Sequence, residues 1–187
     1  MRRDWKQTVR AGSDIALIGF GMLLFALPVV TLGAALGAGS AAVHHWCGHG
    51  DLPRLRTALR WYVRGILPGL AATVCAAPLA ALLAVNLWAA RTGAVPGGVP
   101  LVAATLLVTV AALGVAALTV VRVGALEGRH WARALRQALS AGRALPASAG
   151  IAVLAALLAM LLPATVPLVA GCALFALHVV SRRYGMR

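Results

Sequence analysis

Residues 27–34, with the sequence Leu-Pro-Val-Val-Thr-Leu-Gly-Ala, interrupt an apolar run that extends from Ile15 to Val43. The run has 29 residues, whereas one membrane helix needs about 20. Pro28 removes a backbone N–H and Gly33 weakens the helix, so this stretch predicts a break. We therefore expect two short helices that enter and leave the membrane on the same side. The alternative is one long tilted span.

Four further apolar runs fill most of the remaining chain: Ile66 to Ala90, Leu101 to Val121, Ala147 to Leu162, and Thr165 to Val180. The last two are separated only by a turn with Pro163 and Pro167, which predicts a tight helical hairpin. Hydrophobic residues make up 61% of the chain and charged residues 11%, whereas globular domains have about 45–50% and about 25%. The sequence therefore predicts an all-α, polytopic transmembrane helical bundle, with residues 1–187 as a single integral membrane domain. It has six membrane helices if the first run is a hairpin and five if that run is one span.

Connections with many basic residues alternate along the chain with connections that have few or none. Residues 2–10 include four of them, and the turn between Pro163 and Pro167 includes none. Cytoplasmic loops are enriched in arginine and lysine. We therefore expect a multi-pass protein of the plasma membrane whose N- and C-termini are both cytoplasmic.

The formal net charge of +13 comes from 17 basic and 4 acidic residues. In a soluble protein this excess would favour nucleic-acid binding. Here the basic residues flank apolar runs instead of forming a continuous stripe. We therefore expect the lipid bilayer, with its anionic headgroups, to be the partner, and no nucleic acid.

Two basic segments between the runs have the pattern of amphipathic interface helices. Their apolar positions, at helical spacing, are Leu55, Ala58, Leu59, Tyr62 and Val63 in the first segment and Trp131, Leu135, Ala138 and Gly142 in the second. The arginines on the other faces are the candidate contacts for lipid or a partner: Arg54, Arg56, Arg60, Arg64, Arg129, Arg133, Arg136 and Arg143. Either these helices anchor the protein to anionic lipid, or they dock a cytoplasmic partner. With the runs that follow, they form a weak internal repeat over residues 52–90 and 129–162.

Side chains that support catalysis or metal binding are scarce. The densest polar cluster extends from His44 to Asp51, but Gly48 and Gly50 are expected to end the helix there and scatter its ligands. All four acidic residues lie at or outside the run boundaries, which argues against an ion-coupled transporter. His178 is expected near the cytoplasmic end of the last helix. We predict no catalytic residue, no cofactor and no metal site, and a protein that is not an enzyme.

Three glycine pairs have the spacing that lets helix backbones approach closely. They are Gly33 with Gly37, Gly65 with Gly69, and Gly124 with Gly128. We expect these glycines to be packing residues. Their spacing leaves homo-oligomerisation open.

The stretch from Leu27 to Ala34, followed by small residues and an arginine-rich amphipathic helix, resembles the YesL family of bacterial membrane proteins. Residues 122–145, which lead into a membrane run, are similar to the second half of that family, and the resemblance covers roughly residues 10–180. It implies a small polytopic protein associated with bacterial carbohydrate-uptake systems of the ABC type. It carries no catalytic residue onto this chain. The segment from His44 to Asp51 departs from the family, in which aromatic and basic residues are more usual there.

The function that these observations predict is a non-enzymatic accessory component of a bacterial carbohydrate (ABC-type) transport system. Its arginine faces would contact a transporter permease or ATPase subunit. The alternative is a self-contained channel or facilitator for a small solute, which the weak repeat and the break near Pro28 favour.

Overall fold

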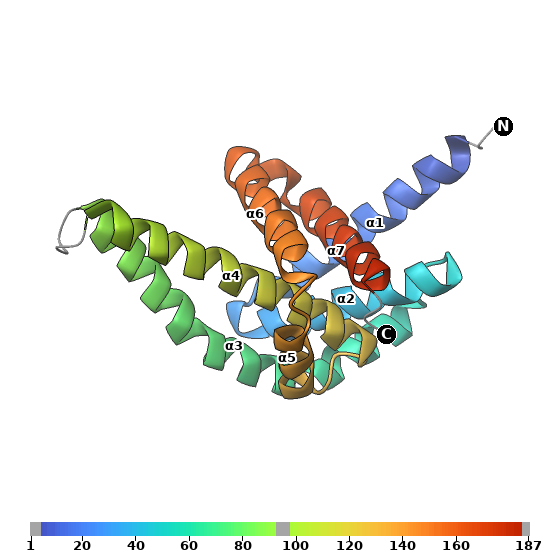
Figure 1. Cartoon of the computed structure of the whole chain (residues 1–187). Helices are drawn as coiled ribbons and strands as arrows, with labels where there is room; N and C mark the ends of the chain where they lie inside the picture. The colour runs from blue at the N-terminus through green and yellow to red at the C-terminus, as the bar shows by residue number, and fades with distance from the viewer. Residues whose placement is uncertain (1–4, 93–97, 185–187) are drawn as a thin grey trace.

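The computed structural model describes residues 5–92 and 98–184, in which the chain forms helices joined by short turns (Figure 1). The elements are α1 (Trp5–Ala26), the 3-10 helix η1 (Val29–Thr31), α2 (Leu32–His49), α3 (Leu55–Arg91), α4 (Gly98–Ala125), α5 (Trp131–Ser140), α6 (Leu145–Leu161), the 3-10 helix η2 (Pro163–Thr165) and α7 (Val166–Arg183). Neither described range contains a strand, so the all-α prediction is confirmed for them.

Four of these helices are long and apolar enough to cross a membrane, namely α1, α3, α4, and α7 together with the turn before it. The pair α5 and α6 meets at 115° across a short break and adds a fifth span if the two helices count as one bent span. Helix α2 is not among them, because its last turns carry His44, His45 and His49. The described helices support the prediction of an integral membrane protein, and the count of five or six membrane helices stays a prediction.

The first apolar run folds back on itself at the break predicted around Pro28, so that α1 and α2 are antiparallel. The side chain of Met22, late in α1, lies against Gly39 in the first half of α2. Earlier in α1, Asp14 Oδ2 accepts a hydrogen bond from Trp46 Nε1, late in α2, over 3.3 Å. The structure therefore has the predicted hairpin and not the alternative single helix.

Thr31 holds the turn between α1 and α2. Its hydroxyl oxygen lies 2.8 Å from the carbonyl oxygen of Phe25 and 2.7 Å from that of Pro28, and its backbone N–H donates to the same Pro28 oxygen. Pro28 lacks the N–H that would continue α1, and the last carbonyl groups of a helix need donors from elsewhere. The Pro-Val-Val-Thr segment therefore favours a sharp reversal of the chain.

Small residues along α2 let its backbone touch α3 and α4. A Cβ atom on Gly33 would collide with the backbone of Gly69 in α3, and one on Gly124 in α4 would collide with Ser40. The hydroxyl of Thr73 in α3 accepts a hydrogen bond from the Gly33 N–H at 3.2 Å and donates to the Gly69 carbonyl oxygen at 2.9 Å. This satisfies an N–H group at the start of α2, where a bilayer offers no water. The prediction that these glycines are packing residues is confirmed for Gly33, Gly69 and Gly124.

The first basic segment does not form a helix of its own, and its place at the membrane interface stays a prediction. Residues 55–64 are the first turns of α3, which continues without interruption through Pro68. Proline removes a helical hydrogen bond, but Gly65 and Gly69, on either side of Pro68, both lie against Ala34 of α2. Helix α3 is thus continuous across Pro68 and packs on α2 at both flanking glycines.

The second basic segment does form a helix of its own, α5, which is sharply bent relative to α6. Gly142 lies in the break, and Pro146 lies in the first turn of α6, where a missing N–H costs little. In residues 52–90 of the predicted repeat, the basic and apolar parts therefore belong to one helix. In residues 129–162 a break separates them into two helices. The repeat itself stays a prediction.

Helix α7 packs on α1 and α2, and α6 packs on α4 and α7. Helices α6 and α7 form the predicted tight hairpin, with η2 as the turn. The backbones of α1 and α7 approach closely where Gly19 meets Pro167 and Gly171 meets Ile15. In Figure 1 the α3–α4 pair and the α6–α7 pair extend away from the region that α5 and the end of α7 occupy. The apolar tips of both pairs are therefore separated from that region.

The Gly69→Ala variant should lower the stability of the fold, because its added methyl group meets the backbone of α2 rather than a flexible side chain. We expect the free energy of unfolding to fall by about 1–3 kcal/mol, the usual cost of overpacking. Gly150→Ala in α6 is the matched control, since a Cβ atom there meets nothing within 4 Å. Denaturant unfolding of the purified protein in detergent micelles measures both, and equal midpoints would contradict the proposed contact.

Candidate functional site

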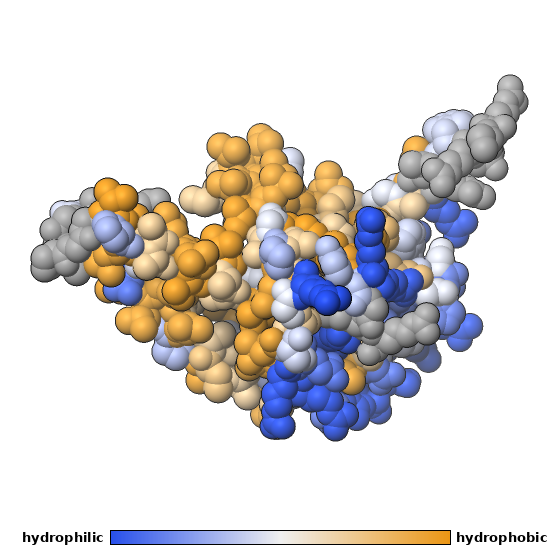
Figure 2. Space-filling view, viewed as in Figure 1, coloured by the Kyte–Doolittle hydropathy of each residue, from blue (hydrophilic) through white to orange (hydrophobic). Residues whose placement is uncertain are grey.

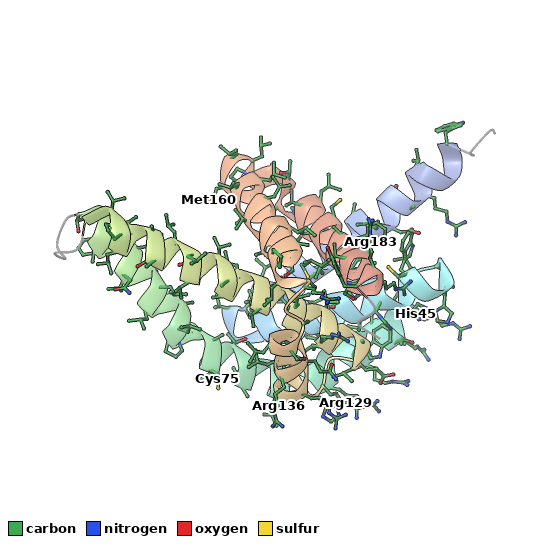
Figure 3. The ribbon with its side chains drawn as sticks, viewed as in Figure 1. His45, Cys75, Arg129, Arg136, Met160 and Arg183 are labelled. Carbon is green, nitrogen blue, oxygen red and sulfur yellow. The ribbon has the colours of Figure 1, made fainter. Side chains whose placement is uncertain are left out.

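The candidate arginines lie on the surface at one end of the molecule. All eight are exposed: Arg54, Arg56, Arg60, Arg64, Arg129, Arg133, Arg136 and Arg143. Gly128 lies beside the backbone of Trp61, which brings the basic part of α3 next to the segment that leads into α5. The hydrophilic surface gathers at the lower right of Figure 2, over α5 and its surroundings, and Arg129 and Arg136 point outward there in Figure 3. The two basic segments therefore contribute to one surface.

These arginines are available to other molecules. Within residues 5–92 and 98–184, none of the eight forms an ion pair with a carboxylate; the ion pair found there joins His45 to Asp51 at 3.7 Å. A guanidinium group without a carboxylate partner can bind a phosphate or carboxylate through two parallel N–H donors. The surface therefore suits anionic headgroups or the acidic surface of a protein.

Helix α5 has a buried face, an exposed apolar face and a basic face. Ala134 and Ala138 are buried where α5 packs on α4, while Leu135 is 43% and Leu139 59% exposed. Within the predicted apolar stripe, Ala138 is buried against α4 and Leu135 and Gly142 are exposed, because alanine fits the close approach to α4 better than leucine does. Exposed leucines beside arginines are typical of helices at a membrane surface.

A cavity of about 470 Å³ lies where the last turns of α2, α4 and α7 meet. It is lined by His44 from α2, by Val121, Arg122 and Ala125 from α4, and by His178, Ser181 and Arg182 from α7. This site could not be predicted from the sequence, because each polar residue looks like an ordinary residue at the end of an apolar run. Only the fold brings the three run ends together.

Hydrogen bonds hold two of the cavity side chains. Arg182 Nη1 donates to the carbonyl oxygen of Cys47 over 2.8 Å, which ties the end of α7 to the end of α2. His178 is 1% exposed, and its Nδ1 lies 2.9 Å from the carbonyl oxygen of Leu174. Its Nε2 has no hydrogen-bond partner in the part of the chain that the structure describes. The ring of His44 lies 5.9 Å from that of His178, measured between centroids.

The polar cluster from His44 to Asp51 forms the end of α2, but Gly48, which was expected to end the helix together with Gly50, is still helical. The helix ends at His49, and Gly50 has a φ of 77°, the left-handed conformation that glycine favours after a helix. The rings of His45 and His49 stack with their centroids 4.3 Å apart. Among the described residues, no three histidine, cysteine, aspartate or glutamate side chains are grouped to hold a metal ion.

No family model, curated protein or solved structure matches this chain. The resemblance to the YesL family, and the association with carbohydrate uptake that it implies, therefore stay predictions.

Arg182 should depress the basicity of His44, which lies beyond the apolar run. Partial burial of the His44 ring at the rim where α2 meets α7 lowers its pKa, and the positive charge of Arg182 lowers it further. In the Arg182→Gln variant the pKa of His44 should therefore rise, while staying below its ordinary value because the burial persists. NMR titration of histidine-labelled protein measures the change. Arg183→Gln is the control, and a His44 pKa that responds equally to both substitutions would contradict the contact.

Proposed function

We propose that this chain is a non-enzymatic integral membrane protein of the bacterial plasma membrane that serves as an accessory component of a carbohydrate transport system. The observation that supports the proposal best is the exposed arginine surface formed by the start of α3 and by α5 with its flanking residues. The carbohydrate part of the proposal comes from the resemblance to the YesL family alone.

The arginine surface supports docking of an acidic partner. Its guanidinium groups keep their hydrogen-bonding capacity for another molecule, since they form no ion pair with the described carboxylates. A permease or ATPase subunit with acidic residues at its cytoplasmic rim would complement this surface. Complementary charges of this kind speed the encounter and select the partner.

In the proposed orientation the arginine surface faces the cytoplasm, and both termini lie on the same side. The excess of arginine and lysine on the cytoplasmic side of membrane proteins supports this orientation. Leu135 and Leu139 of α5 would then enter the lipid interface while the neighbouring arginines contact anionic headgroups. Lipid would hold one part of the surface, and the partner would bind the rest.

Reversing four charges should abolish association with the partner. The variant combines Arg56→Glu, Arg60→Glu, Arg133→Glu and Arg136→Glu, all at exposed positions. Affinity purification from gently extracted native membranes, followed by mass spectrometry, should recover permease or ATPase subunits with the unmodified protein in stoichiometric amount. The variant should recover at least about tenfold less, because like charges across an interface repel.

The matched control carries lysine at the same four positions and should keep most of the association, since it keeps the charge. Resistance to alkaline extraction checks that each variant is still inserted in the membrane. Recovery of the same subunits with the charge-reversed variant would rule out docking through these arginines.

A self-contained channel or facilitator for a small solute is the second candidate function. The break between α1 and α2 and the 115° bend between α5 and α6 favour it, because discontinuous helices often line solute sites. Uptake of a panel of sugars into liposomes that contain the purified protein tests it. Uptake no faster than into empty vesicles would count against this function.

A further inference from the structure

The cavity between the ends of α2, α4 and α7 is lined by hydrogen-bonding side chains that are cationic or neutral. Arg122 and Arg182 supply guanidinium groups, His44 and His178 supply imidazoles, and Ser181 supplies a hydroxyl. No carboxylate is among the described residues that line it. This combination favours an anionic ligand.

We propose that the cavity binds a phosphate-bearing ligand, with Arg122 and Arg182 as the contacts for the phosphate oxygens. Guanidinium groups bind phosphate through two parallel N–H donors, a geometry that a single ammonium group lacks. Basic pockets between membrane helices on the cytoplasmic side are typical sites for lipid phosphates. A volume of about 470 Å³ is large enough for a lipid headgroup or a small phosphorylated compound, and therefore also for phosphate itself.

Arg182 is already positioned for this role. Its Nη1 donates to the Cys47 carbonyl oxygen at 2.8 Å, which fixes the plane of the guanidinium group and leaves other N–H donors of that group for a ligand. Cations are also favourable at helix C-termini on their own. If the cavity arginines only stabilised the helix ends, the cavity would bind no ligand. Detection of a bound ligand therefore distinguishes a binding role from a purely structural one.

His178 adds a more specific feature. The carbonyl oxygen of Leu174 can only accept, so its 2.9 Å contact places the proton of the neutral ring on Nδ1. Nε2 then becomes an acceptor, and it is buried without a partner in the described residues. Leaving a buried acceptor unpaired is unfavourable. His178 lines the cavity, but its Nε2 is covered, so a ligand hydroxyl would donate to this nitrogen only after the ring turns toward the cavity.

The phosphate has two sources, an anionic lipid headgroup or a soluble phosphate compound. His44, Ala125 and Arg182 are exposed at the rim, so the cavity is accessible from the surface of the molecule. The site is separate from the arginines of α3 and α5, and the proposal does not depend on partner docking.

Two binding measurements on the full chain test the proposal and separate the two sources. In the first, delipidated protein in a neutral detergent is titrated with inorganic phosphate by isothermal titration calorimetry. In the second, protein is taken from phosphatidylcholine nanodiscs that contain a minor fraction of phosphatidylglycerol. Native mass spectrometry then counts the phosphatidylglycerol molecules that stay bound to each chain.

The variant His44→Gln/Arg182→Gln should weaken binding at least about tenfold in each measurement in which the unmodified protein binds, because the variant lacks charge-assisted hydrogen bonds. The matched control, His49→Gln/Arg10→Gln, removes the same two residue types from exposed positions outside both the cavity and the arginine surface, and it should keep the affinity. Retention of phosphatidylglycerol without phosphate binding assigns the site to lipid, and phosphate binding assigns it to soluble compounds. Binding in neither measurement, or an equal loss in both variants, would overturn the proposal.

Discussion

The backbone contact of α2 with α3 and α4 is the constraint on which the other features depend. Lipid tails are as apolar as leucine, so membrane helices associate through close packing and hydrogen bonds rather than through the hydrophobic effect. At Gly33 and Gly69 the two backbones touch, and the Thr73 hydroxyl bridges them. At Gly124 the backbone of α4 closes on Ser40 in the same way. These contacts hold the ends of α2 and α4 beside each other, and the cavity lies between those ends.

Features of the fold that depend on local residue chemistry could be predicted from the sequence. Pro28 predicted the reversal that Thr31 completes, and Gly50 predicted the end of α2. Features that depend on which helices touch could not. The first basic segment was expected to be a separate helix, yet α3 continues through Pro68 because α2 packs on both sides of that residue. On α5 the apolar pattern alone could not show that alanines face α4 while Leu135 faces outward.

The candidate functional residues also include some that could be predicted from the sequence and some that could not. Charge and helical spacing predicted the exposed arginine surface, and all eight arginines are exposed. The cavity had no local signal, because His44, Arg122 and Arg182 belong to three separate run ends. Their proximity follows from the packing of α2 on α4 and from the hydrogen bond that Arg182 donates to the backbone oxygen of Cys47. The same packing leaves the apolar helix pairs α3–α4 and α6–α7 extending away from the arginine surface (Figures 1 and 2). One end of the molecule thus carries the groups that can recognise a charged partner, and the rest offers apolar surface to lipid.

A disulfide between positions 22 and 39 tests most directly whether the first apolar run folds back to place α2 among the other helices. A Cβ atom on Gly39 would lie 3.3 Å from the Cβ of Met22. This is close to the Cβ–Cβ distance of a disulfide, which is about 3.5–4.5 Å. A single continuous helix would hold the two positions about 25 Å apart. In a background without the three native cysteines, Met22→Cys/Gly39→Cys should cross-link within one chain on mild oxidation in membranes, as read by peptide mass spectrometry. Met22→Cys/Gly48→Cys should not. Absence of the first cross-link, or equal cross-linking of both pairs, would contradict the folded-back arrangement.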